Sequence, residues 1–330
     1  MLPVSRFVLS RDGAAWELHN MAASLCHLVC GMFLFFMGMA FLRKALKRKC
    51  GVQVERVLRA LTPNPITSVV TGTLATSALQ SSSAVTVIVI SLVDSGVIDV
   101  YQAFYIIMGA NLGTCLTAYI VAFRFWIPGP LVVAGSVLLY VLISRRGRKD
   151  LALMVLGLGC IIEGVEAFGS ALAWLAEVPG ILDTLVVFGQ VPFFGVLSGA
   201  LFTGIIQSSS MTTAMLVGLV RQGLIGLKSA VSLALGSNIG TCVTTLIAGF
   251  SASSAGRLAA RLHLMFNLIG VVAVLPVFNG FVWMVEAVSP IDPGYTLANA
   301  HTLFNLMSIL VVFPWGRQFV DLVKGRHEWI

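Results

Sequence analysis

Charged residues are scarce in this sequence. Only 11% of its 330 residues are charged and 58% are hydrophobic, whereas soluble domains carry about 25% charged residues. This composition excludes a cytoplasmic enzyme, a disordered regulator and a small secreted module. Because a helix needs about 20 apolar residues to cross a bilayer, the chain is long enough for roughly ten crossings. We therefore expect an all-α polytopic membrane protein.

Cysteine motifs are also missing. The six cysteines include no CxxC pair and no Cys/His spacing of the kind that holds zinc, so we expect no disulfide framework, no transition metal and no cofactor. The N-terminal segment mixes charged and apolar side chains and shows no cleavage site, so residues 1–23 are expected to lie along the membrane interface.

The positive charge is concentrated beside the apolar segments. Sixteen of the 21 lysines and arginines lie in four clusters, as in the cytoplasmic loops of membrane proteins. They predict contact with anionic membrane lipids rather than with nucleic acid. In a plasma (inner) membrane they place the C-terminus in the cytoplasm and the N-terminus outside. The clusters are 43–59, 145–149, Arg257 with Arg261, and 317–326.

Two apolar segments are too long for one crossing and are polar in the middle. Residues 65–93 are interrupted by Gln80-Ser81-Ser82-Ser83, and residues 185–220 by Gln207-Ser208-Ser209-Ser210. Broken backbone at membrane depth is tolerated only where it is buried in protein or lines a wet cavity. Each segment is therefore predicted to be a re-entrant hairpin that enters and leaves on one side.

The two hairpins belong to an internal repeat. Residues 72–120 align with residues 199–247 without a gap, with 20 identities in 49 positions. The same alignment matches Asn111-Leu112-Gly113-Thr114-Cys115 with Asn238-Ile239-Gly240-Thr241-Cys242. Generic apolar similarity would not preserve polar residues in register, so we expect two copies of one unit.

Charge and repeat together predict opposite orientations for the two copies. The first basic cluster places the mouth of the first hairpin at the cytoplasm, whereas residues 176–190, before the second, contain two acids and no base. Two inverted-topology repeats, each with a re-entrant hairpin and a broken helix, are typical of secondary transporters. The expected units are 1–23 (interfacial), 24–143 (repeat 1), 151–285 (repeat 2) and 286–330 (last transmembrane helix and short cytoplasmic tail).

The repeated strings offer hydroxyls, carboxamides and backbone N–H groups without a cation from either hairpin. No Lys or Arg occurs in residues 60–123 or 150–220. An anion would therefore be held by helix N-termini, where free N–H groups and the helix dipole favour negative charge. Side-chain oxygens and unwound carbonyls would suit a hard cation such as Na+. Gly113 and Gly240 are expected to let the backbone turn sharply beside a ligand.

Other polar residues allow two interpretations each. Glu163 and Glu166, close together in an apolar segment, could couple or gate transport or could make a structural hydrogen bond. His263 and His301 open two His-x-x-Phe-Asn-Leu strings, which serve either polar helix packing or the site. The serine strings could also serve packing alone, but their duplication in register argues against this. A catalytic serine would need a base, and no His or Asp lies nearby in sequence, so no enzyme is expected.

These strings resemble those of the type II sodium-dependent phosphate cotransporters, including bacterial members. The resemblance rests on both Gln-Ser-Ser-Ser strings together with residues 109–114 and 236–241, and it covers about residues 24–315. It implies two inverted repeats and inward movement of inorganic phosphate with Na+ as the coupling ion. It also implies that the Gln-Ser-Ser-Ser turns hold both ions and that Glu166 matches an acidic position common in bacterial relatives.

The sequence thus predicts a phosphate importer that works by sodium symport and alternating access between the repeats. The alternatives are a sodium-coupled carrier of sulfate or arsenate, an anion channel, and a sensor; a homodimer is one option for the assembly. The residues expected to bind phosphate are Ser82, Ser83, Ser209, Ser210, Asn111 and Asn238. The residues expected to bind sodium, the only metal ion involved, are Gln80, Ser81, Thr114, Gln207, Ser208 and Thr241.

Replacing Gln207 with alanine tests the sodium assignment. We expect Gln207→Ala to weaken the apparent sodium affinity of transport, because it removes one oxygen ligand from a neutral cation site. The measurement is uptake as a function of sodium concentration. An unchanged sodium dependence would contradict the assignment.

Overall fold

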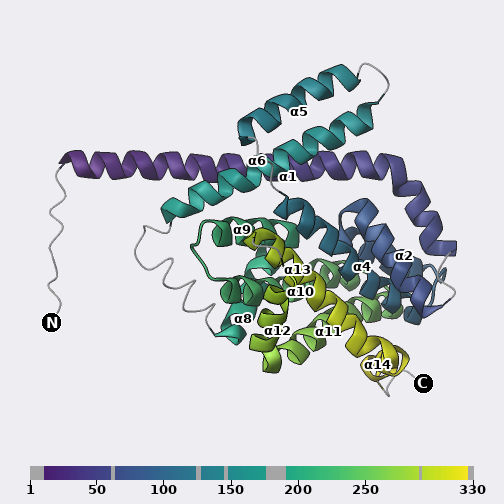
Figure 1. The fold of residues 1–330 in the computed structure, drawn as a ribbon. Helices are drawn as coiled ribbons and strands as arrows, with labels where there is room; N and C mark the ends of the chain where they lie inside the picture. Colours follow the sequence, from purple (N-terminus) through teal and green to yellow (C-terminus); the bar gives the residue numbers. More distant parts are fainter. Residues whose placement is uncertain are drawn as a thin grey trace, which may run out of the picture.

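The computed structural model describes residues 11–60, 64–123, 128–144, 148–175, 191–289 and 292–325. These residues form helices joined by short turns, with no strand among them, which confirms the predicted all-α fold. Six stretches of the described helices are long and apolar enough to cross a membrane. The helices gather into one bundle, from which the N-terminal part of the first helix projects (Figure 1, purple).

The helices follow the two halves of the chain. The first half contains α1 (Arg11–Ala60), α2 (Pro65–Leu79), α3 (Ser82–Asp94), α4 (Val100–Ala122) and α5 (Gly129–Ser144). The second half contains α6 (Lys149–Leu175), α8 (Pro192–Ile206), α9 (Ser209–Arg221), α10 (Leu227–Phe250) and α11 (Ser254–Val274). The 3₁₀ turn η1 (Leu275–Val277), α12 (Phe278–Ala287), α13 (Pro293–Val312), the 3₁₀ turn η2 (Phe313–Trp315) and α14 (Gly316–Lys324) follow.

Both predicted hairpin segments are broken where the polar strings lie. The pair α2 and α3 meets at Gln80-Ser81, and the pair α8 and α9 meets at Gln207-Ser208. These helices are 13 or 15 residues long, or about 20–22 Å at 1.5 Å per residue, which is too short to cross the apolar core of a bilayer alone. Residues 185–190 of the second predicted segment lie outside the described residues.

The backbone shows the same special conformations in both halves. Gln80 and Gln207 are both left-handed, with φ of 52° and 56°, and Gly96 and Gly223 have φ of 69° and 70°. The alignment of residues 72–120 with 199–247 matches Gln80 with Gln207 and Gly96 with Gly223. The internal repeat is therefore a repeat of backbone structure as well as of residue types.

Glycines bring α2 against α4 and α8 against α10. A Cβ on Gly109 would lie 1.9 Å from the carbonyl oxygen of Val69, and one on Gly236 would lie 2.0 Å from that of Val196. Four residues further along both helices, Gly113 lies against Thr73 and Gly240 lies against Ala200. The two helices of each pair therefore run parallel. Only glycine permits such close backbone approach, and this contact fixes each hairpin to the helix that follows it.

The prediction of turns at the Asn-x-Gly-Thr strings is wrong. Both strings lie inside the continuous helices α4 and α10, so neither is the predicted broken helix. Gly113 and Gly240 serve helix packing instead: a Cβ on either would lie 2.5 Å from a carbonyl oxygen, that of Thr73 or of Ala200.

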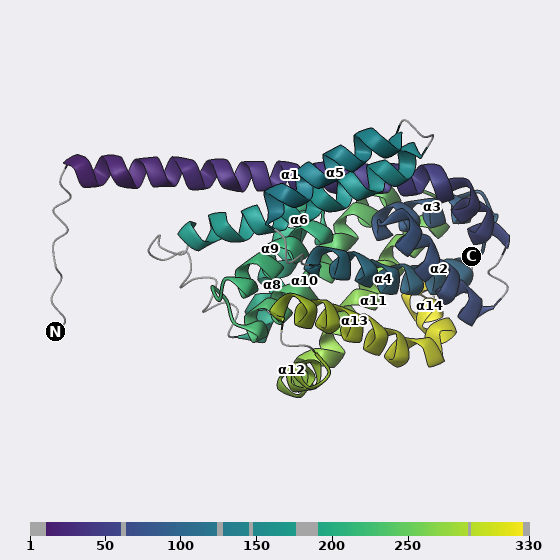
Figure 2. The ribbon, with the colours of Figure 1, turned by 45° about the horizontal axis from the view of Figure 1, so that its top comes forward.

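The first helices of the two halves, α1 and α6, run antiparallel. Gly31 packs against Gly164, and Gly38 packs against Gly157, so a step forward along one helix is a step backward along the other. Inverted repeats require this direction, although the inversion across a membrane stays a prediction. Figure 2 shows the two helices lying alongside each other.

The first basic cluster does not form a loop as expected. Helix α1 continues to Ala60, so Arg43 and the basic residues after it lie on the helix. The same helix also runs through the boundary expected at residue 23. The domain boundaries given above stay predictions, and residues 326–330 of the tail lie outside the described part.

Arg221, outside the four clusters, joins three helix ends. Its Nη2 donates to the carbonyl oxygen of Ala122 at 2.5 Å and to Oδ1 of Asp292 at 3.0 Å. Asp292 in turn caps α13 by accepting from the amide of Tyr295. Partial burial opposes ionisation of Asp292, but the hydrogen bonds from Arg221 and from the backbone outweigh it, and its pKa lies below the ordinary value.

A glycine-to-alanine pair tests the parallel packing. We expect Gly236→Ala to destabilise the protein by about 1–3 kcal/mol or more, the usual cost of overpacking, because backbone atoms of α8 occupy the position of the new methyl group. Gly280→Ala in α12 is the control, since nothing lies within 4 Å of its Cβ position. Thermal unfolding in detergent measures both; equal melting temperatures would contradict the packing.

Candidate functional site

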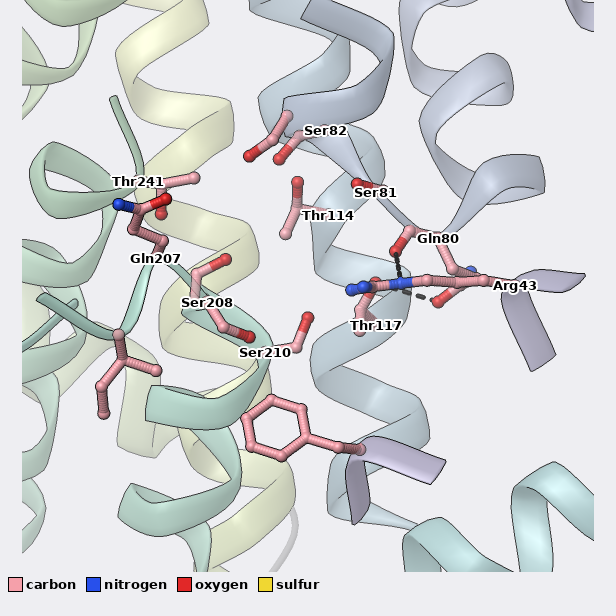
Figure 3. Close-up of a pocket in the computed structure, with 14 residues that line it drawn as sticks. Arg43, Gln80, Ser81, Ser82, Thr114, Thr117, Gln207, Ser208, Ser210 and Thr241 are labelled. Atoms are coloured by element: carbon pink, nitrogen blue, oxygen red, sulfur yellow. Dashed lines mark hydrogen bonds between the residues drawn. The ribbon is translucent and has the colours of Figure 1, made fainter. Parts of the chain in front are cut away.

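A cavity of about 280 Å³ lies between the two hairpin turns (Figure 3). All eight residues of the two Gln-Ser-Ser-Ser strings line it, although the strings belong to different halves of the chain. Thr114 from α4 and Thr241 from α10 also line it, so ten of the twelve residues expected to bind ions meet here. The remaining lining residues are Phe36, Arg43, Thr117 and Ile206.

Two helix N-termini face this cavity. Ser81 caps α3 by accepting from the amide of Ala84, and Ser208 caps α9 by accepting from the amide of Met211. The first intrahelical bonds of these helices begin at Val85 and Thr212. The amides of the serines between cap and third position are among those that a helix leaves unpaired at its start. The cavity therefore combines serine hydroxyls, free N–H groups and two positive dipole ends, a suitable environment for an anion.

The left-handed glutamines make these N-termini possible. A left-handed residue that is not glycine costs roughly 1–2 kcal/mol, and each Gln ends one helix so that the next begins two positions later. The side chain of Gln80 supports its turn: its Nε2 donates to the carbonyl oxygen of Ser77 at 2.7 Å, and its Oε1 accepts from Thr117 at 2.9 Å. Gln80 is only 2% exposed.

The second turn lacks this closure. Gln207 is exposed, and the residue matching Thr117 is Thr244, whose buried hydroxyl has no hydrogen-bond partner among the described residues. The first half uses the hydroxyl of Thr117 to donate to the side-chain oxygen of Gln80, and the matching hydroxyl of Thr244 makes no such bond to Gln207. The two half-sites have the same sequence motif but differ in how many of their polar groups are hydrogen-bonded.

The threonines on α4 and α10 present oxygen lone pairs. Thr114 Oγ1 donates to the carbonyl oxygen of Ala110 at 3.1 Å, and Thr241 Oγ1 donates to that of Ser237 at 2.7 Å. A hydroxyl that donates its hydrogen to the backbone still has two acceptor lone pairs. Both threonines can therefore ligate a hard cation without losing their own hydrogen bond.

Arg43 is the lining residue that sequence reasoning missed. It reaches the cavity from α1, and its Nε donates to the carbonyl oxygen of Gln80 at 3.0 Å (Figure 3). The sequence had placed it in a cytoplasmic cluster. Its position as the first base after the apolar segment 22–42 was the available signal. Among the described residues that line the cavity, none is acidic and Arg43 is the only one with a formal charge.

Asn111 and Asn238 do not line the cavity. Their Nδ2 atoms donate to the carbonyl oxygens of Ile107 and Ala234, one turn earlier on their own helices. The Oδ1 of Asn111 lies 3.4 Å from Nε2 of His263. Their assignment to phosphate stays a prediction.

Glu163 and Glu166 also lie outside the lining, on α6. Both are partly buried, and Oε2 of Glu163 is a buried atom without a hydrogen-bond partner among the described residues. A role in coupling or gating stays a prediction. Neither carboxylate is among the residues that line the cavity.

The two histidine strings pack in matching ways. Cys242 on α10 donates to the carbonyl oxygen of His263, and Cys115 on α4 donates to that of His301. One helical turn further on, Asn267 and Asn305 donate back to the sulfur of the same cysteines. The contacts favour the interpretation of these strings as polar helix packing.

Comparison with known proteins assigns the family. The sequence profile of the Na+/Pi-cotransporter family matches residues 34–170 and 178–289, well over half of the chain. The chain belongs to this family. The resemblance seen in the sequence is thereby confirmed, and the protein is a multi-pass membrane protein of a family of transporters rather than enzymes.

Individual relatives agree with this assignment. "Uncharacterized protein YqeW" of Bacillus subtilis is 35% identical over 263 residues, which cover 79% of this chain and 85% of YqeW. "Putative inorganic phosphate export protein YjbB" of Salmonella typhimurium is 27% identical over 270 residues, 81% of this chain and 49% of YjbB. "Sodium-dependent phosphate transport protein 2A" of Oryctolagus cuniculus is 37% identical over 116 residues, 34% and 18% of the two chains. The chain thus spans about half the length of YjbB, and no solved structure matches it.

Two variants of Gln80 separate backbone strain from side-chain function. We expect Gln80→Gly to keep the turn, because glycine is left-handed at little cost, while Gln80→Ala keeps the strain and should be about 1 kcal/mol less stable than Gln80→Gly. Both lose the carboxamide and should lose transport alike. Melting temperature and uptake distinguish the two effects; a Gly variant that transports like the wild type would show that the carboxamide of Gln80 is not needed for transport.

Proposed function

We propose that the protein imports inorganic phosphate by sodium symport, with alternating access between the two repeats. One observation carries the proposal: the N-termini of α3 and α9, which belong to different halves of the chain, open into the same cavity. Membership of the Na+/Pi-cotransporter family supports the choice of phosphate and sodium. The plasma (inner) membrane, with the C-terminus in the cytoplasm, is the proposed location.

The phosphate would bind between the two serine turns. A tetrahedral oxyanion has many acceptor sites, and the hydroxyls and N–H groups of Ser82, Ser83, Ser209 and Ser210 supply donors from both sides. Ser82 and Ser210 are buried, at 6% and 8% exposed, so little bulk water competes there. Donors fixed by two helix starts need no rearrangement when the anion enters.

The sodium ion would bind beside the second turn. Gln207, Ser208 and Thr241 offer neutral oxygens there, and the unpartnered hydroxyl of Thr244 lies on the same helix as Thr241. The first cluster is less suitable, because the Gln80 oxygen is already bonded to Thr117 and the Arg43 guanidinium lies against the same turn. Repulsion between two cations in a low-dielectric site favours the half without the arginine.

Charge balance would couple the two ions. The lining carries one formal positive charge, which cannot neutralise a phosphate dianion. A sodium ion beside the anion reduces the remaining charge, so each ion should bind more tightly in the presence of the other. The transport direction then follows the ion gradients, and an inward sodium gradient drives phosphate inward.

Uptake by proteoliposomes of the purified protein tests the proposal. With an inward sodium gradient we expect phosphate to accumulate, and replacement of sodium by potassium or choline should abolish the uptake. The double variant Ser82→Ala, Ser209→Ala should lose it as well, because it removes one hydroxyl donor from each turn.

Competing anions separate the alternatives. Sulfate cannot donate a hydrogen bond at neutral pH, so strong competition by sulfate would favour a broader oxyanion carrier, and arsenate would report shape selectivity. Single-channel currents would favour a channel. Correctly folded protein that transports none of these anions would contradict the proposal.

A further inference from the structure

We propose that Arg43 is the fixed cationic contact of the transported oxyanion and makes the site prefer the dianion over the monoanion. This inference rests on the proposed function and adds to it a residue outside both repeated strings. It adds to the donors of both serine turns a charged contact on the side of Gln80, and it explains a charge that has no counterpart in the other half.

The guanidinium is held in place by the first turn. Nε of Arg43 donates to the carbonyl oxygen of Gln80 at 3.0 Å, and that carbonyl belongs to the left-handed residue that breaks the hairpin. The side chain extends from α1 to the cavity, as Figure 3 shows. With Nε fixed, the two Nη groups form a planar fork beside the cavity, a geometry that binds two oxygens of one oxyanion.

Among the described residues, the Arg43 charge has no acidic partner. Arg43 is partly buried, and no carboxylate of the described residues lies within ion-pair distance of it. None of the lining residues is acidic. An unpaired charge in a low-dielectric position is costly, so an anionic ligand is the counter-ion that this arrangement requires.

The second half of the chain has no equivalent of Arg43. The packing glycines of α1 and α6 have the same spacing in the sequence, so that Gly31 corresponds to Gly157 and Gly38 to Gly164 when the two halves are aligned. Continued without a gap, this alignment places Gly169 opposite Arg43. The site thus contains two copies of nearly every polar group but, among its described residues, a single fixed positive charge, which is bonded to the Gln80 turn.

This charge should discriminate between protonation states of phosphate. Coulomb attraction to a dianion is about twice that to a monoanion at the same distance. Phosphate interconverts between the two near neutral pH, whereas sulfate remains a dianion. Removal of the charge should therefore weaken phosphate binding most on the alkaline side of neutrality.

The test compares Arg43→Met, Arg43→Lys and the wild type in sodium-driven phosphate uptake on both sides of neutral pH. We expect Arg43→Met to raise KM for phosphate at least about tenfold, or roughly 1.4 kcal/mol, and to abolish the preference for alkaline pH. Arg43→Lys should keep that preference with a smaller rise in KM, because lysine retains the charge and loses the fork. The control is Arg48→Met on the same helix, whose side chain is 56% exposed and lies 3.7 Å from Asp150.

A second measurement separates folding from binding. The melting temperature of each purified variant is recorded with sodium alone and with sodium plus inorganic phosphate, since a ligand raises it by mass action. We expect Arg43→Met to keep the sodium shift and to lose the phosphate shift. If Arg43→Met does not fold, Arg43→Lys replaces it: a raised KM for phosphate supports the inference, and an unchanged KM contradicts it.

These measurements distinguish a failure of the inference about Arg43 from a failure of the proposed function. An Arg43→Met variant with wild-type KM and pH profile, or an equal loss in Arg48→Met, would overturn the inference while sodium-driven uptake by the wild type leaves the proposed function standing. A wild type that neither transports phosphate nor is stabilised by it would overturn both.

Discussion

The structure depends on how a chain can end a helix inside a membrane. Lipid offers no hydrogen bonds, so each backbone N–H and C=O at that depth needs a partner in the protein or in a wet cavity. Left-handed Gln80 and Gln207 end α2 and α8, and serine caps start α3 and α9 immediately afterwards. Two helix starts are thereby placed within the bundle. The cavity between them contains the polar groups that these breaks would otherwise leave without partners.

Close packing holds the breaks in position. Parallel contacts at glycine fix each hairpin to α4 or α10, and the polar cysteine contacts then attach a further helix to each half. His263 on α11 and His301 on α13 meet equivalent cysteines. Helix α13, which was expected to lie outside the repeats, therefore contacts α4 through a Cys–His pair in the same way as α11 contacts α10.

Sequence reasoning found the hairpin breaks, the repeat and ten cavity residues, because apolar patterning alone does not repeat polar residues in register. It misjudged Gly113 and Gly240, since glycine serves a sharp turn and close helix packing equally well and only the three-dimensional neighbours distinguish the two. It missed Arg43 for a related reason. A basic residue at the end of an apolar segment does not reveal whether the helix stops there or continues. Helix α1 continues past the site to Ala60.

The difference between the half-sites bears on how an alternating mechanism could work. In a fully symmetric pair of repeats, the inward and outward states would exchange the roles of the two halves. Here Gln80 is buried and bonded to Thr117 and Arg43, whereas Gln207 is exposed. Because Arg43 has no equivalent, its charge stays with the first hairpin in either state. The charged contact to the proposed anion would then stay with the first hairpin while the serine donors of the second half, together with sodium, change their position relative to it.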